Sequence, residues 1–80
     1  MWYTILIDIL WVMKNESIRL GENLKRIRNE KDISQGDIAR ELSVDRGFIS
    51  TIENGKTNPT LATIAKLAKA VGVTTNELLK

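Results

Sequence analysis

Two short helices joined by only three residues constrain this fold more than any other feature of the sequence. Capping signals predict one helix over residues 35–42 and the next over residues 46–54. A link as short as residues 43–45 forces the second helix to cross the first steeply. Such a close crossing needs a small residue at the contact, and we expect Ala39 to lie there.

Helix starts and stops recur about every dozen residues from Ser17 onward, and they predict five helices. The predicted helices are 18–31 after Ser17, 35–42 after Ser34 with Asp37 completing a capping box, 46–54 after Asp45, 61–71 after Pro59 and Thr60, and 76–79 after Thr74 or Thr75. Gly55 and Gly72 are expected to end two of them in the left-handed conformation. Because no part of this region alternates with a period of two, we predict an all-α fold.

Apolar residues at helical spacing predict the core of this fold. They are Leu20, Leu24 and Ile27 in the first of these helices and Leu61, Ile64, Leu67, Ala68 and Val71 in the fourth.

The first thirteen residues differ in character from the rest of the chain. They contain three of the four aromatic residues and a single charge, Asp8. The stretch is shorter than the roughly 20 apolar residues of a membrane-spanning helix, and it lacks the basic start and cleavage site of a signal peptide. We therefore expect a cytoplasmic protein without a membrane partner, with an apolar extension over 1–16 and a domain over 17–80. The extension either is not native, with Met13 as the natural start, or is an arm that packs on the domain or on a partner subunit.

The composition excludes most enzymes and metal proteins. The chain has no cysteine and no histidine, so it lacks thiolate and imidazole ligands and the commonest general base. We expect no catalytic site, no metal site and no cofactor. The chain has 12 basic and 10 acidic residues, and this excess is too small to indicate a polyanionic partner by itself.

The predicted helix 46–54 has two contrasting faces. At about 100° per residue, Asp45, Phe48, Ile49 and Ile52 lie on one side, where we expect the apolar residues to pack on the core. The opposite arc is polar, small and rich in hydrogen-bond donors; it holds Arg46, Gly47, Ser50, Thr51 and Asn54. A surface of this kind suits the major groove of DNA, where base edges offer hydrogen-bond acceptors and thymine methyl groups.

Residues 34–59 resemble the helix-turn-helix of the Cro and phage-repressor family, also called the Xre type. The resemblance rests on several positions together: Ser34, Gln35, Ile38, Ala39, Leu42, Val44, Ile49, Ser50, Ile52, Glu53, Gly55, Asn58 and Pro59. Flanking residues 20–28, 67–68 and 78–79 also fit, so the resemblance covers about residues 17–80. It implies a compact five-helix domain that binds specific DNA sequences, usually as a dimer.

The resemblance also implies roles for individual positions. It assigns base reading to Arg46, Gly47, Ser50 and Thr51, and phosphate contacts to Gln35, Asn54, Lys56, Thr57 and Asn58. Gln35 would lie at a helix N-terminus, where free N–H groups favour anions. Gly47 offers no side chain, although its backbone could approach DNA closely. Lys25 and Arg26 are further candidates for contacts with the DNA backbone.

Two features of the resemblance concern structure rather than reading. The family positions that match Arg28 and Glu53 often form an ion pair, which would orient helix 46–54. The turn position that the family usually fills with glycine is Ser43 here. A left-handed backbone at that serine would cost roughly 1 to 2 kcal/mol relative to glycine.

These observations predict a transcriptional regulator, and in particular a repressor. It would place helix 46–54 in the major groove of double-stranded DNA as a homodimer on a two-fold symmetric site. A phage-type repressor and a controller protein of a restriction-modification system both remain open, although residues 45–50 faintly resemble the latter. The alternative is an antitoxin or another protein-interaction module of the same fold, which would bind a toxin or other protein through the apolar extension and the last helix.

Overall fold

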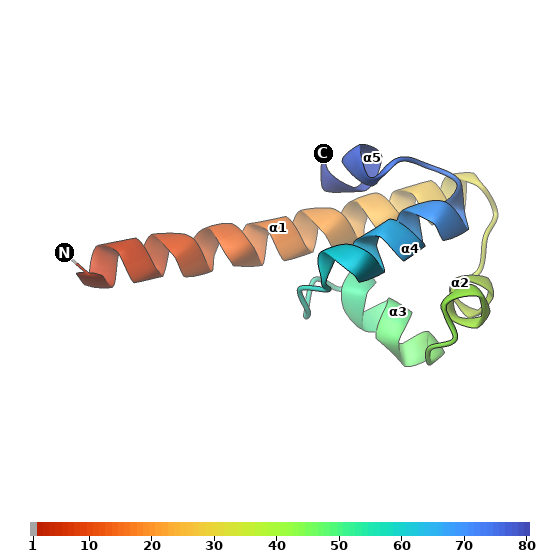
Figure 1. Cartoon of the computed structure of the whole chain (residues 1–80), viewed down its shortest axis with the longest axis horizontal. Helices are drawn as coiled ribbons and strands as arrows, with labels where there is room; N and C mark the ends of the chain where they lie inside the picture. Colours follow the sequence, from red (N-terminus) through yellow and green to blue (C-terminus); the bar gives the residue numbers. More distant parts are fainter. Residues whose placement is uncertain (1) are drawn as a thin grey trace.

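The structure is a computed structural model that describes residues 2–80, apart from the side chains of residues 2, 3, 13 and 14. Every regular element in this range is an α-helix: α1 (Trp2–Glu30), α2 (Gln35–Leu42), α3 (Arg46–Glu53), α4 (Leu61–Val71) and α5 (Thr75–Leu79). In Figure 1, α1 forms the long axis of the molecule, and the other helices gather around its C-terminal half. The predicted all-α fold of five helices is confirmed.

Local capping chemistry accounts for the positions of α2, α4 and α5. The Ser34 side chain accepts a hydrogen bond from the Asp37 N–H at 3.0 Å, and the Asp37 carboxylate accepts one from the Ser34 N–H at 3.2 Å, so the predicted capping box is present. The bond from the Ser34 backbone holds the pKa of Asp37 below its usual value. The Thr60 and Thr74 side chains cap α4 and α5 by accepting hydrogen bonds from the N–H groups of Thr63 and Glu77.

The N-terminus of α3 departs from the capping prediction. Asp45 occupies the N-cap position, but its side chain makes no capping hydrogen bond. The prediction that this carboxylate caps the helix is therefore wrong, and the short link 43–45 sets where α3 begins. The C-terminus behaves as expected, because Asn54 follows the last helical residue and Gly55 turns the chain with a φ of 70°.

The start of α1 was predicted wrongly. Ser17 does not begin a helix; it lies in the middle of α1 and is only 6% exposed. A serine caps a helix where the preceding chain leaves the helical conformation. Residues 2–16 contain no glycine or proline to cause such a break, so the helix continues through them.

The N-terminal part of α1 extends beyond the rest of the protein as an apolar arm, defined here as residues 4–12 (Figure 1). A helix of 29 residues is about 44 Å long, which accounts for most of the 46 Å length of the molecule. The large apolar side chains of the arm are between 48% and 68% exposed: Ile5, Leu6, Ile7, Ile9, Leu10, Trp11 and Val12. Within residues 2–80, no helix is long and apolar enough to cross a membrane.

The core lies between the C-terminal half of α1 and the four shorter helices. The buried apolar residues are Leu20, Leu24, Ile27, Ile38, Ala39, Ile49, Ile52, Ile64, Leu67, Ala68, Val71 and Leu78. Leu61, predicted to join them, is 71% exposed. It is the first residue of α4, and side chains tilt toward the helix N-terminus, so that of Leu61 points past the end of the helix rather than into the core.

Candidate nucleic-acid interface

The turn between α2 and α3 sets the direction of α3. Ser43 adopts the left-handed conformation, with φ 57° and ψ 44°, at the position where the resemblance led us to expect glycine. The N–H groups of Ser43 and Val44 donate to the last carbonyls of α2, including a 2.9 Å bond from Val44 to Ala39. Ala39 is 5% exposed, as expected for a small residue in this crowded region. This turn closes α2 and lets α3 cross it.

The inner side of α3 is fixed in the core, and its outer side faces solvent. Ile49 and Ile52 are fully buried, and Phe48 packs against the core from a partly buried position. The five residues of the predicted polar arc turn outward: Arg46, Gly47 and Asn54 are exposed, and Ser50 and Thr51 are half-buried. We call these five residues the outer face of α3. The helix therefore exposes a small, polar surface to solvent, while its opposite side is fixed by packing in the core.

Hydrogen bonds within the outer face hold two of its side chains in place. The Thr51 hydroxyl donates to the Gly47 carbonyl oxygen at 2.8 Å, one helical turn earlier. The Asn54 amide donates to the Ser50 hydroxyl oxygen at 3.4 Å. The two hydroxyls thus differ. That of Thr51 donates its hydrogen bond to the backbone, whereas that of Ser50 accepts a hydrogen bond and can still donate one.

An ion pair ties the end of α3 to α1. The Arg28 guanidinium donates two hydrogen bonds to the Glu53 carboxylate, from Nε at 2.6 Å and from Nη2 at 3.0 Å. The Arg28 side chain is 13% exposed and that of Glu53 is 3% exposed. These bonds raise the pKa of Arg28 above its ordinary value, although burial opposes them. The pair that the family resemblance implied is therefore present and largely shielded from water.

Gln35 and Ile33 extend this ion pair into a network. Gln35 Nε2 donates to Glu53 Oε1 at 3.0 Å, and Arg28 Nη1 donates to the carbonyl oxygen of Ile33 at 3.0 Å. The network joins α1, the link before α2, the first residue of α2 and the last residue of α3. Sequence reasoning assigned Gln35 only to phosphate contact and missed its bond to Glu53. No local signal connects two residues that are 18 positions apart.

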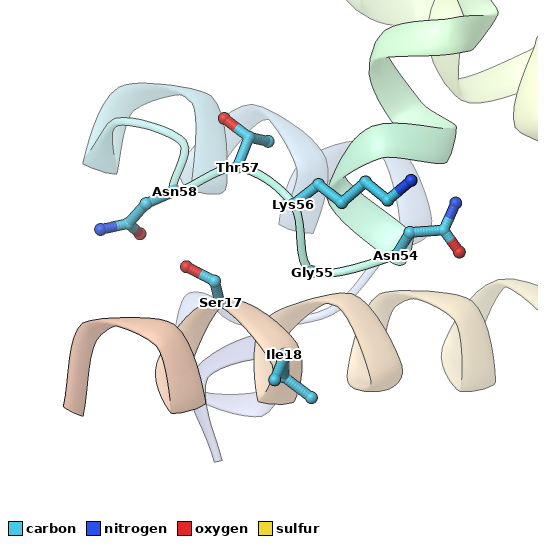
Figure 2. A pocket seen from close by; sticks show the side chains of 7 residues that line it. All are labelled: Ser17, Ile18, Asn54, Gly55, Lys56, Thr57 and Asn58. Atoms are coloured by element: carbon cyan, nitrogen blue, oxygen red, sulfur yellow. The ribbon is translucent and has the colours of Figure 1, made fainter. Parts of the chain in front are cut away.

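A loop of polar residues continues the candidate interface beyond α3. Asn54, Gly55, Lys56, Thr57 and Asn58 line an open hollow together with Ser17 and Ile18 of α1. Figure 2 shows this loop running alongside α1, with Ser17 pointing toward it. Gly55 is needed at the point of closest approach, because a Cβ atom there would lie 3.0 Å from the Ile18 Cα atom. The predicted phosphate-contact residues 54 and 56–58 are thus neighbours, on one loop that α1 supports.

Two further basic candidates for DNA contact, Lys25 and Arg26, lie on α1 and not on the outer face of α3. Lys25 and Arg26 are both exposed. Arg26 forms an ion pair with Glu30 at 3.4 Å, one turn along the same helix. A pair this exposed contributes little to stability, so it leaves the arginine able to contact other groups.

Comparison with known proteins decides the family. A family model described as helix-turn-helix matches residues 24–78, which is more than half of the chain. The chain belongs to this helix-turn-helix family. Among helix-turn-helix relatives, control protein C.MunI from a Mycoplasma species is 42% identical over 67 residues, covering 82% of this chain and 90% of that protein.

Two solved structures of restriction-modification controller proteins are similar to this chain. C.AhdI from Aeromonas hydrophila has a TM-score of 0.75 at 31% identity, over 80% of this chain and 97% of that one. C.Esp1396I, solved as a tetramer in complex with its natural 35 base-pair operator, has a TM-score of 0.67 at 29% identity, over 80% of this chain and 95% of that one.

The family fixes the general function of the chain. Helix-turn-helix proteins of this kind are DNA-binding transcriptional regulators and not enzymes, so the predicted class of function is confirmed. The alternative prediction, an antitoxin or other protein-interaction module, gains no support from these relatives.

Proposed function

We propose that this protein is a sequence-specific reader of double-stranded DNA that represses transcription by occupying its site with α3 in the major groove. The observation that carries the proposal is the division of α3 into a fully buried side, with Ile49 and Ile52, and the polar outer face opposite. The Arg28–Glu53 network holds the C-terminal end of the same helix. A reading helix has to be rigid relative to its domain, because base contacts depend on hydrogen-bond geometry. Sharing a compartment with its DNA would place the protein in the cytoplasm.

Base reading is proposed for Arg46, Gly47, Ser50 and Thr51. Arg46 is exposed at the N-terminal end of α3, the part of a recognition helix that reaches base edges. Its guanidinium can donate two hydrogen bonds to guanine O6 and N7. The Ser50 hydroxyl accepts a hydrogen bond from Asn54, so its own hydrogen remains available for donation to a base or a phosphate.

Phosphate contacts are proposed for two places beside the outer face. One is the loop with Asn54, Lys56, Thr57 and Asn58, where a lysine and several amide and hydroxyl groups are neighbours. The other is the start of α2 at Gln35. Its side-chain amide donates one hydrogen to Glu53 and keeps a second, so the phosphate contact there is proposed for this remaining N–H and for the backbone N–H groups of Gln35 and Gly36, which precede the capped Asp37.

The experiment that tests this function is selection of duplexes from a random pool, followed by binding of the selected duplex at several salt concentrations. A reader of DNA should yield a consensus and a linear fall of log K with log salt. Arg46→Ala should relax the preference at one base position, by about 1 to 3 kcal/mol. Lys56→Ala should instead weaken all sequences alike and reduce the salt slope by about 1. A pool that returns no consensus, together with equal effects of the two variants, would contradict the proposal.

A homodimer on a two-fold symmetric site is part of this proposal. C.Esp1396I, an oligomeric relative in its operator complex, supports it by similarity. The similarity to C.MunI over nearly its whole length favours a restriction-modification controller over a phage-type repressor. Helix-turn-helix dimers place their two recognition helices one turn of DNA apart, about 34 to 36 Å, on half-sites that mirror the two-fold symmetry of the protein. The selected consensus should therefore consist of two half-sites in inverted order.

The apolar arm is proposed to pair with the arm of a second copy. Leu6 and Leu10 continue, at the spacing of a helical stripe, the line of Leu20, Leu24 and Ile27 that packs in the core. Thr4 and Asp8 lie on the opposite side of the helix and leave one narrow polar edge. The large side chains of the arm are apolar and exposed, so burying them against a second arm removes apolar surface from water, which is favourable.

Shortening the chain to residues 13–80 tests the arm. Removal of seven exposed apolar side chains should shift the monomer–dimer equilibrium toward monomer, as measured by sedimentation equilibrium. Leu10→Asp should have the same effect, whereas Thr4→Asp on the polar edge should have little. An unchanged dissociation constant after shortening would mean that the arm is dispensable and that Met13 is a sufficient start.

A further inference from the structure

On the outer face of α3, a glycine without a side chain, Gly47, lies one turn before Thr51, and the Thr51 hydroxyl donates a hydrogen bond to its carbonyl oxygen. Thr51 Oγ1 lies 2.8 Å from the carbonyl oxygen of Gly47. A carbonyl oxygen can only accept a hydrogen bond, so the proton between these two atoms comes from Thr51. Threonine in helices commonly donates to the preceding turn in this way. The side chain is therefore left without a donor for a DNA base.

The geometry of a β-branched side chain decides what Thr51 presents instead. Its oxygen turns back toward the preceding turn, so the methyl group takes a different staggered position on Cβ. Thr51 can therefore offer DNA a methyl group and an oxygen that only accepts, and of these two we take the methyl group as the one that reads a base. In the major groove, the apolar group on a base edge is the 5-methyl group of thymine, whereas guanine offers two acceptors that need donors.

Gly47 leaves the neighbouring surface open for such a methyl group. Beyond its two chain neighbours and the adjacent backbone of α3, a Cβ atom built at Gly47 would meet no atom within 4 Å, so no side chain from another part of the described protein fills the space. The residue is exposed, in the first turn of α3. A side chain at position 47 would stand in this open space, on the face of α3 that is proposed to meet the base edges.

We propose that Thr51 and Gly47 together read the 5-methyl group of a thymine in each half-site. This inference rests on the proposed function, because it names the base chemistry that one part of the DNA-reading surface recognises. Donor-based reading falls to Arg46 and Ser50, whose protons are available. The outer face is thus divided into a donating part and a methyl-contacting part.

The test uses the full chain and the duplex selected from the random pool, with each thymine replaced singly by deoxyuridine. Deoxyuridine lacks only the 5-methyl group. One such replacement in a half-site should weaken binding by about fourfold, the equivalent of one buried methyl group. Thr51→Ser, which keeps the hydroxyl and removes the methyl, should weaken binding to the thymine duplex by a similar factor and should add no further loss on the deoxyuridine duplex.

Two variants separate methyl reading from hydroxyl reading. Thr51→Val keeps a methyl group and removes the hydroxyl, so its affinity should stay within about twofold of the original. Gly47→Ala should weaken binding to the thymine duplex more than to the deoxyuridine duplex, because its methyl group occupies the open space. Thermal unfolding of each variant checks that the fold is intact.

The outcomes distinguish this inference from the proposed function. If a consensus is selected but deoxyuridine is neutral at every thymine, or if Thr51→Val loses binding while Thr51→Ser keeps it, methyl reading is wrong and DNA reading stands. If the pool returns no consensus, both are wrong. Loss at one thymine that disappears in Thr51→Ser supports the inference.

Discussion

Replacing Arg28 by alanine should lower the free energy of unfolding by about 3 to 5 kcal/mol, the usual range when one partner of a buried ion pair is removed. The Glu53 carboxylate, only 3% exposed, would lose both hydrogen bonds from the guanidinium and remain in the interior. The carbonyl of Ile33 would lose its bond from Nη1 as well. Because Gln35 would still donate to Glu53, we expect a loss near 3 kcal/mol rather than 5.

Denaturant unfolding of Arg28→Ala measures this loss, with Arg26→Ala as a matched control on the same helix. Arg26 also pairs with a glutamate, but its side chain is 56% exposed, and surface pairs contribute about 0 to 1 kcal/mol. Adding Glu53→Gln to Arg28→Ala should recover part of the stability, because it removes the unpaired charge. Equal effects of the two alanine variants would show that burial does not strengthen the Arg28–Glu53 interaction.

This network also explains why DNA binding should fall when Arg28 is lost, although Arg28 lies on α1 and not on the outer face of α3. Its partner Glu53 is the last residue of α3 and directly precedes Asn54 and the loop with Lys56. The proposed base contacts and loop phosphate contacts therefore flank the point that Arg28 fixes. A residue of this kind positions the reading surface without touching DNA.

The elements that sequence analysis predicted well are those with local causes. The capping box of Ser34 and Asp37 depends on residues three positions apart, and it fixed the start of α2 correctly. The left-handed stop at Gly72 and the caps at Thr60 and Thr74 are equally local. The buried and exposed sides of α3 followed from its periodicity alone, because a helix of eight residues in a small domain has only one side to bury.

The elements that it missed depend on contacts between distant residues or on context. Serine is a residue type that commonly caps helices, so Ser17 was predicted to start one. It lies inside α1 instead, because the residues before it are helical too. Asp45 is also a preferred N-cap residue type, and it does occupy the N-cap position of α3, but its side chain makes no capping hydrogen bond. The bond from Gln35 to Glu53 requires α2 and α3 to be folded against each other before it can be seen.

Gly21→Ala and Gly47→Ala should change stability in opposite directions, although both replace a helical glycine. Alanine favours a helix over glycine by up to about 1 kcal/mol, so Gly47→Ala, with open space around it, should stabilise the fold by that amount. A Cβ atom at Gly21 would instead lie 2.4 Å from the Ile52 carbonyl oxygen and 2.7 Å from that of Glu53. These are backbone atoms at the end of α3, so no side-chain movement relieves the overlap.

The net effect of Gly21→Ala should be a loss of about 2 kcal/mol or more, since overpacking of 1 to 3 kcal/mol at its upper end exceeds the gain in helix propensity. Thermal or denaturant unfolding of the two variants side by side measures the difference, which should be about 3 kcal/mol. Gly21→Ala should also weaken DNA binding, because α1 and α3 must separate at the residues next to the Arg28–Glu53 pair. A Gly21→Ala protein as stable as Gly47→Ala would mean that α3 can shift freely against α1, and the rigid support proposed for the reading helix would then be absent.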